Sequence, residues 1–233
     1  MKKIGIIFAM KEELDALKKY LTITNKYNIF DLEFIESKKD DLEIILVECG
    51  VGKVNAARTT QILIDNMQVD YIFNIGVAGG VSNKLTVGDI ALGEKLVQHD
   101  FDITNFDHEK GYIPNVGVYI ESDTYLLNIA NEVLTSIKDI TFHRGVIASG
   151  DIFCTEIKMG EKINYKFNAL CTEMEGASIA QVCLLSHIPF LIIRSISDVI
   201  NDNNKVDYEE FLLSSCDKVA AVMNGILDRL EDE

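Results

Sequence analysis

Short apolar runs alternate along the chain with longer stretches that mix apolar and polar positions. Continuous β-branched runs are typical of strands buried on both faces, and a 3.6-residue apolar period predicts helices. The predicted strands are KIGIIFAM (3–10), LEIILVECG (42–50), YIFNIGVAGG (71–80), VGDIALGEKLV (87–97), HRGVIASG (143–150) and IPFLIIRSISD (188–198). The predicted helices cover 11–21, 52–67, 122–137, 156–167, 174–186 and about 208–230.

Strands that are separated by helices favour an α/β fold with a mixed, mainly parallel central sheet. No linker, composition shift or internal repeat divides residues 1–233, so we expect a single domain. Ligands of such sheets gather at the carboxyl ends of the strands. The segments expected there are AMKEE (9–13), CGVGK (49–53), NIGVAGG (74–80), SGDIFC (149–154), TEMEG (172–176) and RSISD (194–198).

The charge of the chain narrows the choice of partners. Its 22 Lys and Arg residues against 37 Asp and Glu residues give a net charge of −15, which disfavours nucleic acid and anionic membranes. No apolar run approaches the roughly 20 residues that span a bilayer. The five cysteines are odd in number, lie in apolar segments and never form a CxxC pair. They predict reduced core cysteines of a cytoplasmic protein.

Several common motifs are absent from the sequence. GVGKV (50–54) lacks the Ser or Thr and the upstream glycine of a P-loop, and GVAGG (76–80) is not a dinucleotide fingerprint. The four histidines have no metal-ligand spacing, and no G-x-S-x-G elbow occurs. We therefore predict neither a metal nor a cofactor.

Acidic residues at predicted strand ends remain as candidates. Glu13 follows the first strand, and CTEMEGASIA (171–180) places Glu173 and Glu175 where an apolar strand gives way to a helix. Either glutamate could be an ordinary acidic helix start, because carboxylates oppose the helix dipole there. Asp198 ends a deeply apolar strand, and a buried carboxylate needs a partner, which could be Arg194 or a ligand.

Ordered blocks along nearly the whole chain resemble the bacterial 5′-methylthioadenosine/S-adenosylhomocysteine nucleosidases of the nucleoside phosphorylase superfamily. The blocks are GIIFAMKEEL (5–14), CGVGKVNAA (49–57), NIGVAGG (74–80), VGDI (87–90), HDFDIT (99–104), SGDIF (149–153), TEMEGASIA (172–180) and RSISD (194–198). The resemblance implies a three-layer α/β/α sandwich and a homodimer. It also implies an N-glycosyl hydrolase of methionine salvage. Such an enzyme splits 5′-methylthioadenosine and S-adenosylhomocysteine, with 5′-deoxyadenosine as a further candidate, into adenine and the 5′-substituted ribose.

The resemblance also implies roles for individual residues. It makes Glu13 the general base, Glu175 the acceptor for the ribose hydroxyls and Asp198 the general acid, with Glu173 in a supporting part. Ile103 and Phe106 would reach the 5′ pocket from the other subunit. The remaining substrate-binding residues would be Met10, Val77, Gly79, Phe153, Cys154 through its main chain, Met174, Arg194, Ser197 and Tyr208.

These roles make chemical sense for an N-glycosidic bond. Adenine leaves poorly as an anion, so a protonated Asp198 should deliver a proton to N7. This requires a raised pKa, which an apolar strand favours. An ionised Glu13 can direct water at the anomeric carbon. Glu175 can accept from two adjacent hydroxyls, because a carboxylate has two acceptor oxygens. In the superfamily an aspartate at position 198 goes with adenine, and an asparagine with 6-oxopurines.

A phosphorylase is the closest alternative, with phosphate in place of water. The hexameric phosphorylases carry an arginine and a serine where this chain has Asn74 and Val77, so water is the better nucleophile here. Val77 also replaces a serine of many nucleosidases, and Phe8 replaces a glycine. Two further alternatives remain open: an enzyme for another nucleoside, such as futalosine, inosine or uridine, and a silent nucleoside-binding protein.

Overall fold

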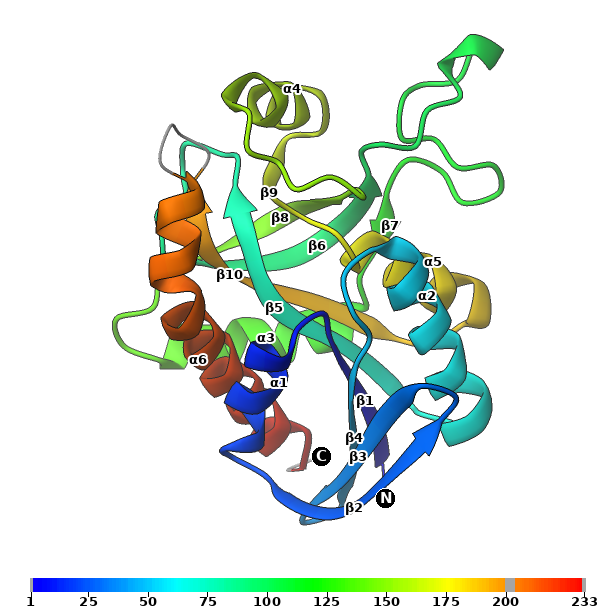
Figure 1. The fold of residues 1–233 in the computed structure, drawn as a ribbon, viewed down its shortest axis with the longest axis vertical. Coiled ribbons are helices and arrows are strands. Elements are labelled where there is room, and N and C mark those ends of the chain that lie inside the picture. Colours follow the sequence, from blue (N-terminus) through cyan, green and yellow to red (C-terminus); the bar gives the residue numbers. More distant parts are fainter. Residues whose placement is uncertain (1, 200–203, 232–233) are drawn as a thin grey trace.

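A computed structural model describes residues 2–199 and 204–231 of the chain (Figure 1). Its strands are β1 (Lys2–Phe8), β2 (Thr22–Ile29), β3 (Leu32–Lys39), β4 (Leu42–Glu48), β5 (Tyr71–Gly80), β6 (Ile90–Gln98), β7 (Ile120–Glu121), β8 (Phe142–Ser149), β9 (Ala169–Glu173) and β10 (Phe190–Val199). Its helices are α1 (Lys11–Lys18), α2 (Lys53–Ile62), α3 (Thr124–Ser136), α4 (Ile157–Phe167), α5 (Gly176–Ser186) and α6 (Asn204–Glu231). A π-helical turn, η1 (Leu63–Met67), continues α2, and a short 3-10 turn, η2 (Thr104–Phe106), lies after β6.

The described strands form one mixed sheet in the order β10-β6-β8-β9-β5-β1-β4-β3-β2, with β7 added to β6. Strand β10 also pairs with β5, so β5, β9, β8, β6 and β10 close into a circuit. The strands β10, β5, β1 and β4 run parallel, as do β6, β8 and β9. Antiparallel pairs join these two groups, at β5–β9 and β10–β6, and make the hairpin edge.

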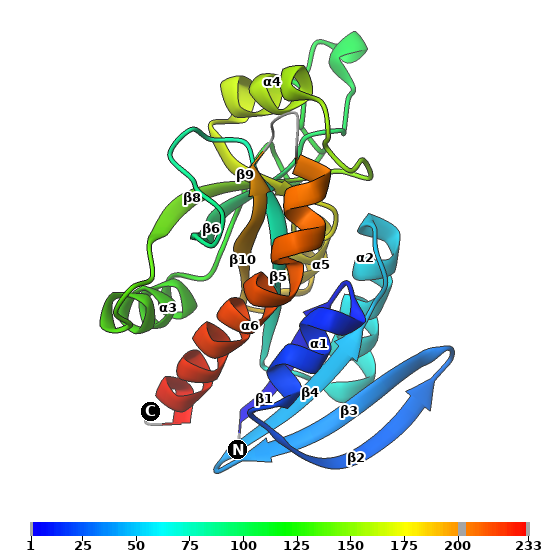
Figure 2. The same ribbon diagram turned by 60° about the vertical axis from the view of Figure 1, so that its left-hand side comes forward.

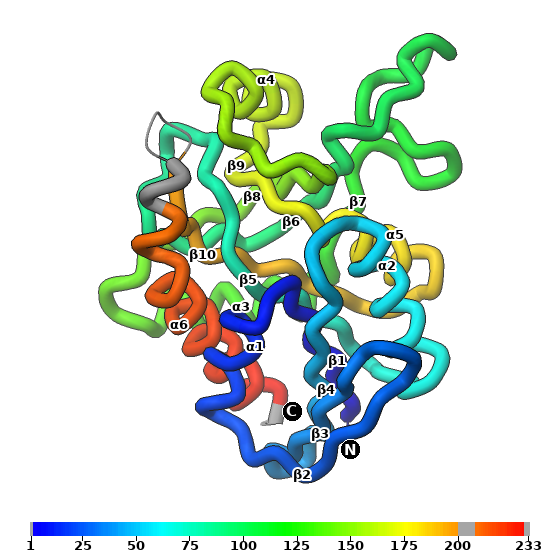
Figure 3. The backbone as a smooth tube through the Cα atoms, in the orientation of Figure 1, coloured from blue at the N-terminus to red at the C-terminus, as the bar shows by residue number. Residues whose placement is uncertain are grey.

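Helices cover both faces of this sheet, as the three-layer prediction requires. Helices α1, α3 and α6 pack on one face in one apolar cluster, and α2 and α5 share a second cluster on the other face. Figure 2 shows α1 and α6 in front of the strands with α3 to their left, and the tube in Figure 3 follows the same path. Helix α4 packs on β8 and β9 in a third, smaller cluster at one end. No helix in the described residues is long and apolar enough to cross a membrane.

The predicted elements are present, with shifted ends. The strand predicted from 87 begins at Ile90, the helix predicted over 52–67 changes to a π turn after Ile62, and the last helix begins at Asn204 rather than near 208. The helices predicted from 122 and 174 begin two residues later, each after an acidic N-cap residue, Asp123 and Glu175. The apolar stretch before TEMEG is indeed a strand, β9.

The hairpin of β2 and β3 was not predicted. Exposed positions dominate β2, so its apolar pattern is weak. The two turns that bound β3 place Phe30 and Asp40 at positive φ (53° and 45°), a region where glycine is the usual signal. Without Gly at these turns, the sequence gives no hairpin motif.

The packing of α6 leads to a stability prediction. Leu227 is fully buried against the sheet, whereas Leu213 on the same helix is 65% exposed. Leu227→Ala should lower the free energy of unfolding by about 2–5 kcal/mol, because it leaves a cavity in the core. Leu213→Ala should change it by less than about 0.5 kcal/mol. Chemical denaturation of both variants measures the difference, and equal losses would contradict the packing described here.

Candidate functional site

A pocket opens where β1, β5, β9 and β10 end, on the carboxyl edge of the sheet. Eleven of the fourteen residues that the sequence predicts for the site line this pocket. They are Met10, Glu13, Val77, Gly79, Phe153, Cys154, Met174, Glu175, Ser197, Asp198 and Tyr208. Residues from five strand-end segments therefore meet at one place, as expected for an α/β sheet, and Tyr208 of α6 joins them.

Glu13 is both an acidic helix start and a pocket residue. It lies in the first turn of α1, and its Oε2 accepts from the backbone N–H groups of Ala9 (2.9 Å) and Met10 (3.1 Å). Its Oε1 reaches across to β5, where the N–H of Val77 donates at 3.0 Å. Three of the roughly four acceptor positions of this carboxylate are therefore filled by main chain. One position remains for a group in the pocket.

Gly76 makes room for this carboxylate. A Cβ on Gly76 would lie 2.3 Å from Oε1 of Glu13 and 3.2 Å from the guanidinium of Arg194. Any side chain at position 76 would therefore displace Glu13 from its place beside β5. Sequence reasoning placed Gly76 only in a glycine-containing block and assigned it no role.

Glu175 is the N-cap residue of α5, and its carboxylate faces the pocket. Its Oε1 accepts from the N–H of Gly52 at 2.7 Å, and its Oε2 accepts from the N–H of Met174 at 3.3 Å. Neither contact is an ion pair or a side-chain hydrogen bond. The carboxylate is thus held in place by main chain and keeps acceptor capacity on both oxygens.

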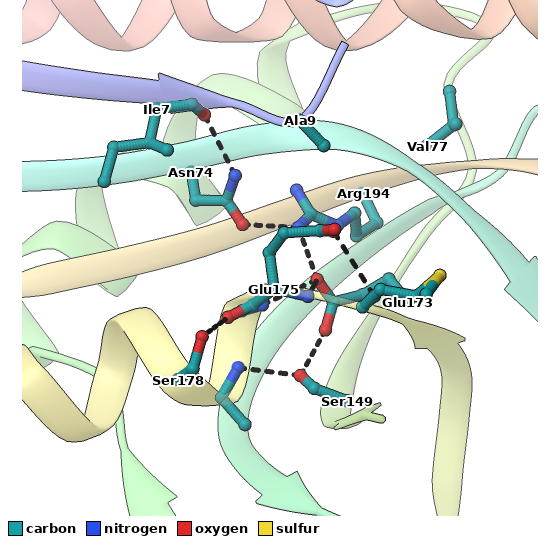
Figure 4. Close-up of polar contacts among 12 residues, drawn as sticks. Ile7, Ala9, Asn74, Val77, Ser149, Glu173, Glu175, Ser178 and Arg194 are labelled. Atoms are coloured by element: carbon teal, nitrogen blue, oxygen red, sulfur yellow. Dashed lines mark hydrogen bonds and ion pairs between the residues drawn. The ribbon is translucent and has the colours of Figure 1, made fainter. Parts of the chain in front are cut away.

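Glu173, two residues earlier, is engaged by the protein itself (Figure 4). Its Oε1 accepts from the hydroxyl of Ser149. Its Oε2 accepts from the N–H groups of Glu175 (3.1 Å) and Gly176 (2.7 Å) at the start of α5, and pairs with the guanidinium of Arg194 at 2.5 Å. Glu173 therefore stabilises the helix start and the arginine, and it also forms part of the pocket lining.

Arg194 is 1% exposed and links strands beneath the pocket. Its Nη2 donates to Oδ1 of Asn74 as well as to Glu173, and the amide of Asn74 donates to the carbonyl of Ile7 at 2.9 Å. A chain of contacts therefore runs from β1 through β5 and β10 to β9 (Figure 4). Arg194 was predicted to contact substrate, but it lies behind the carboxylates and is absent from the pocket lining.

Burial and mutual repulsion shift the protonation of these carboxylates. Burial, with repulsion from Glu173 next, raises the pKa of Glu175 to about 7, while Arg194 and the N–H of Gly52 oppose the shift. Burial also raises the pKa of Glu13, against the opposing effects of Arg194 and three N–H groups. Burial disfavours the charged form of Arg194 and so lowers its pKa, but the surrounding glutamates outweigh this effect and hold the pKa above its ordinary value. Both pocket glutamates therefore become stronger bases than an exposed glutamate.

A β-bulge positions Asp198. On β10, Ile196 lies opposite Ala78 of β5 and Asp198 lies opposite Gly79, so Ser197 is an extra residue in this strand. The hydroxyl of Ser197 donates to Oδ1 of Asp198 at 2.8 Å. A Cβ on Gly79 would lie 3.2 Å from Oδ2 of Asp198, so the glycine leaves that oxygen uncrowded. Asp198 is 2% exposed and lines the pocket.

Aromatic and sulfur-containing side chains close the apolar side of the pocket. Phe153 and Tyr208 meet edge to face, with ring centroids 5.6 Å apart, and the hydroxyl of Tyr208 donates to the sulfur of Met10 at 3.3 Å. Cys154 is buried, and burial, with Asp198 next, raises the pKa of its thiol to about 11. A thiol that stays protonated at neutral pH is not a nucleophile.

Two predicted residues lie away from the pocket. Ile103 and Phe106 belong to the segment around η2, which projects from the body of the molecule in Figure 1, and Phe106 is 75% exposed. Neither lines the pocket of its own chain.

Other lining residues were not singled out from the sequence. They are Ala9, Val51, Ala78, Ile152 and Thr172. Each lies beside a predicted residue in one of the strand-end segments, which was the available signal. In the described residues no group of three His, Cys, Asp or Glu side chains is arranged to hold a metal ion.

Comparisons with known proteins identify the family of the chain. The model of the phosphorylase superfamily matches residues 3–230. The 5′-methylthioadenosine/S-adenosylhomocysteine nucleosidase of Halalkalibacterium halodurans is 39% identical, over 99% of this chain and 100% of its own. Among solved structures, the nucleosidase of S. pneumoniae with a transition-state inhibitor is 36% identical, with a TM-score of 0.93 over 98% of this chain and 99% of the other. The futalosine hydrolase of Helicobacter pylori is 33% identical, with a TM-score of 0.94 over 98% of both chains.

The matches cover nearly the full length of the chain, and the relatives are well above 30% identical. The chain belongs to the phosphorylase superfamily and, within it, to the family of 5′-methylthioadenosine/S-adenosylhomocysteine nucleosidases.

Proposed function

We propose that the protein hydrolyses the N-glycosidic bond of 5′-methylthioadenosine and S-adenosylhomocysteine in methionine salvage, releasing adenine and the 5′-thio-substituted ribose. The observation that carries this proposal is the convergence of Glu13, Glu175 and Asp198 on one pocket from three different strand ends. The names of the full-length relatives support the same reaction. Each carboxylate has a separate task, and its surroundings suit that task.

Asp198 is proposed as the general acid. Transfer of its proton to N7 lets adenine leave as a neutral molecule instead of an anion, which lowers the barrier to breaking the C–N bond. The hydroxyl of Ser197 orients the carboxyl group, and the missing side chain of Gly79 leaves space at its second oxygen. Phe153, Met174 and the main chain of Cys154 would hold the purine next to it, since all three residues line the same pocket.

Glu175 is proposed to receive the two ribose hydroxyls. Its oxygens are held by main-chain N–H groups and still have acceptor positions for two O–H donors. Its negative charge also stabilises the positive charge that develops on the sugar as the bond to adenine breaks. The ionised form is the one that accepts from both hydroxyls.

Glu13 is proposed to direct the water that attacks the anomeric carbon. Three N–H groups fix the carboxylate and leave one acceptor position for the water. Burial raises its pKa, which makes it a better base, because the ideal catalytic pKa lies near the working pH. The water proton passes to Glu13 as the new C–O bond forms. The contact from position 77 to Glu13 is made by the main-chain N–H, so it does not depend on the side chain at that position.

Water is favoured over phosphate by the charge of the pocket. Four carboxylate side chains line it, and none of the described lining residues is a lysine or an arginine. A phosphate dianion needs fixed positive charge and several donors. Arg194 cannot supply this charge, because its guanidinium is engaged with Glu173 and Asn74 behind the pocket.

We also propose a homodimer in the cytoplasm. Met10 and Tyr208 line the pocket beside the expected 5′ position, whereas neither Ile103 nor Phe106 lines it. Pairing of two subunits would let these two apolar side chains complete the pocket of the other subunit. The five cysteines of the chain are unpaired and buried, which supports a reducing compartment.

A second candidate function is hydrolysis of futalosine. It is favoured by the likeness to the Helicobacter pylori futalosine hydrolase, which matches this fold as closely as the nucleosidases do. The same carboxylates would serve both reactions, so the two candidates differ in the substrate that the pocket accepts.

Removal of either proton-transfer group tests the proposed mechanism. Asp198→Asn and Glu13→Gln should each lower kcat for 5′-methylthioadenosine by about 10²–10⁴-fold, because general acid–base catalysis contributes that much. Calorimetric titration should still detect binding of the nucleoside. Glu12→Gln is the matched control, because Glu12 lies in the same helical turn but is exposed, and it should keep wild-type turnover. Near-wild-type turnover in Asp198→Asn and Glu13→Gln would overturn the mechanism.

The pKa of Glu175 leads to a pH prediction. Its folded-state pKa is raised to about 7, and the ionised form binds the ribose hydroxyls, so activity is present above this pKa and is lost as pH falls through it. We expect kcat/KM to decrease below about pH 7 in a profile measured at constant ionic strength. A profile that stays flat down to about pH 5 would show that protonation of Glu175 does not limit the reaction.

A further inference from the structure

Two segments that border the pocket, around Val51 and Ile152, meet the loop after β6 at a small set of charged side chains outside the pocket. Lys53 begins α2, Asp100 follows β6 and Asp151 follows β8. The ammonium of Lys53 pairs with Oδ1 of Asp100 at 2.6 Å, and Oδ2 of Asp100 accepts from the N–H of Asp151 at 2.9 Å. The side chain of Asp151 in turn accepts from the N–H of Lys53 at 2.8 Å. Each residue therefore contacts the other two, and we call this closed set the loop clasp.

The loop clasp lies one residue away from a pocket contact. Gly52 precedes Lys53, and its N–H is the donor to Oε1 of Glu175 at 2.7 Å. Gly52 has a φ of 106°, and a Cβ on it would lie 3.3 Å from Oδ1 of Asp151. The backbone at Gly52 is therefore confined by the clasp on one side while it holds Glu175 on the other. Asp151, another member of the clasp, directly precedes three residues that line the pocket, Ile152, Phe153 and Cys154.

Lys53 is also connected to the helix that carries Glu175. Its ammonium donates to Oε1 of Gln98 at 3.1 Å, and the amide of Gln98 donates to Gln181 of α5 at 2.7 Å. Glu175 is the N-cap residue of this helix. The loop clasp thus constrains both the donor to the Glu175 carboxylate and the helix from which that carboxylate extends.

The central ion pair is shielded from solvent. The side chains of Lys53 and Asp100 are 16% and 20% exposed, in contrast to the pair of Lys95 and Glu121, which is 42% and 72% exposed. Burial raises the pKa of Asp100, but the hydrogen bonds from Lys53 and Asp151 outweigh it and hold the pKa below its ordinary value. Asp100 therefore stays ionised, and a shielded ion pair constrains its loops more firmly than a surface pair does.

We propose that Lys53 and Asp100 are positioning residues, which hold the peptide of Gly52 so that its N–H keeps the Glu175 carboxylate turned toward the ribose hydroxyls. This inference rests on the proposed function, since it assigns a task to residues around the same ribose site. Neither side chain lines the pocket, so both act through the main chain of Gly52.

Loss of the loop clasp should also alter the protonation of Glu175. The N–H of Gly52 lowers the pKa of this carboxylate, and so does Arg194, whereas burial and the charges of Glu173 and Glu13 raise it. The thiol of Cys49 is a further titratable group that interacts with Glu175. Burial and both pocket glutamates raise the pKa of this thiol, so it remains neutral. If the Gly52 N–H moves away from Glu175, one of the contacts that lower the pKa of this carboxylate is lost. The pKa of Glu175 then rises further.

The test compares Lys53→Met, Asp100→Asn, the double variant and Lys53→Arg with the wild-type protein. Lys95→Met is the matched control, because it removes an exposed ion pair from β6, the strand that Asp100 follows. Adenine release from 5′-methylthioadenosine gives kcat and KM over a range of pH, and circular dichroism with thermal unfolding shows which variants are folded.

We expect Lys53→Met and Asp100→Asn each to lower kcat/KM by about tenfold, chiefly through KM, because the ribose contact is made before the bond breaks. The low-pH limb of the kcat/KM profile should move to higher pH. The double variant should lose no more than the worse single variant, because both substitutions break one unit. Lys53→Arg should recover most of the loss, and Lys95→Met should match wild type.

The outcomes separate this inference from the proposed function. A wild-type protein that releases no adenine overturns both. An active wild-type protein with folded Lys53→Met and Asp100→Asn variants, whose kinetics and pH profile lie within about twofold of wild type, overturns the positioning role alone. Losses that multiply in the double variant contradict the two side chains acting together. If Lys53→Met does not fold, the isosteric Asp100→Asn decides by the same criteria.

Discussion

The buried ion pair between Arg194 and Glu173 is the contact on which the acidic site depends. Both side chains are almost completely shielded, at 2% and 3% exposure. Removal of one partner from such a pair typically costs about 3–5 kcal/mol, because the other charge is left uncompensated. Loss of Arg194 would also change the protonation of the pocket. Arg194 opposes the raised pKa values of both Glu13 and Glu175, so without it both pocket carboxylates would bind protons more readily.

This pair also explains why two glutamates of one short segment have different parts. Glu173 ends β9, and its carboxylate oxygens accept hydrogen bonds from Arg194, from Ser149 and from the first N–H groups of α5. Glu175 lies two residues later at the helix start, where the chain turns and its carboxylate enters the pocket. The carboxylate of Glu173 therefore satisfies the first N–H groups of α5, whereas the carboxylate of Glu175 faces the pocket. The first interpretation of the sequence, an acidic helix start, holds for this segment, and the second, a ligand-binding glutamate, is the role proposed for Glu175.

Much of this site could be predicted because its residues follow buried strands. Glu13, Glu175 and Asp198 lie at strand ends. The parallel strands β1, β5 and β10 bring the ends near Glu13 and Asp198 together, and the antiparallel pairing of β9 with the end of β5 brings in Glu175. The position of Arg194 could not be read in the same way. Alternation along β10 does not say whether its side chain faces the pocket or the layer behind it, and the contact with Asn74 decides this. The role of Gly76 depends on a distance of 2.3 Å between two elements, which no local pattern encodes. The closed circuit of β5, β9, β8, β6 and β10 likewise rests on long-range pairing.

The most direct measurement is the set of products formed from 5′-methylthioadenosine, S-adenosylhomocysteine, 5′-deoxyadenosine and futalosine, each with and without inorganic phosphate. An acidic pocket that directs water should release adenine and free 5′-thio-substituted ribose from the first two at a rate that phosphate does not change. Formation of a ribose 1-phosphate, or a rate that requires phosphate, would contradict the hydrolytic mechanism. Efficient cleavage of futalosine without cleavage of the two thioether nucleosides would assign the pocket to the second candidate instead.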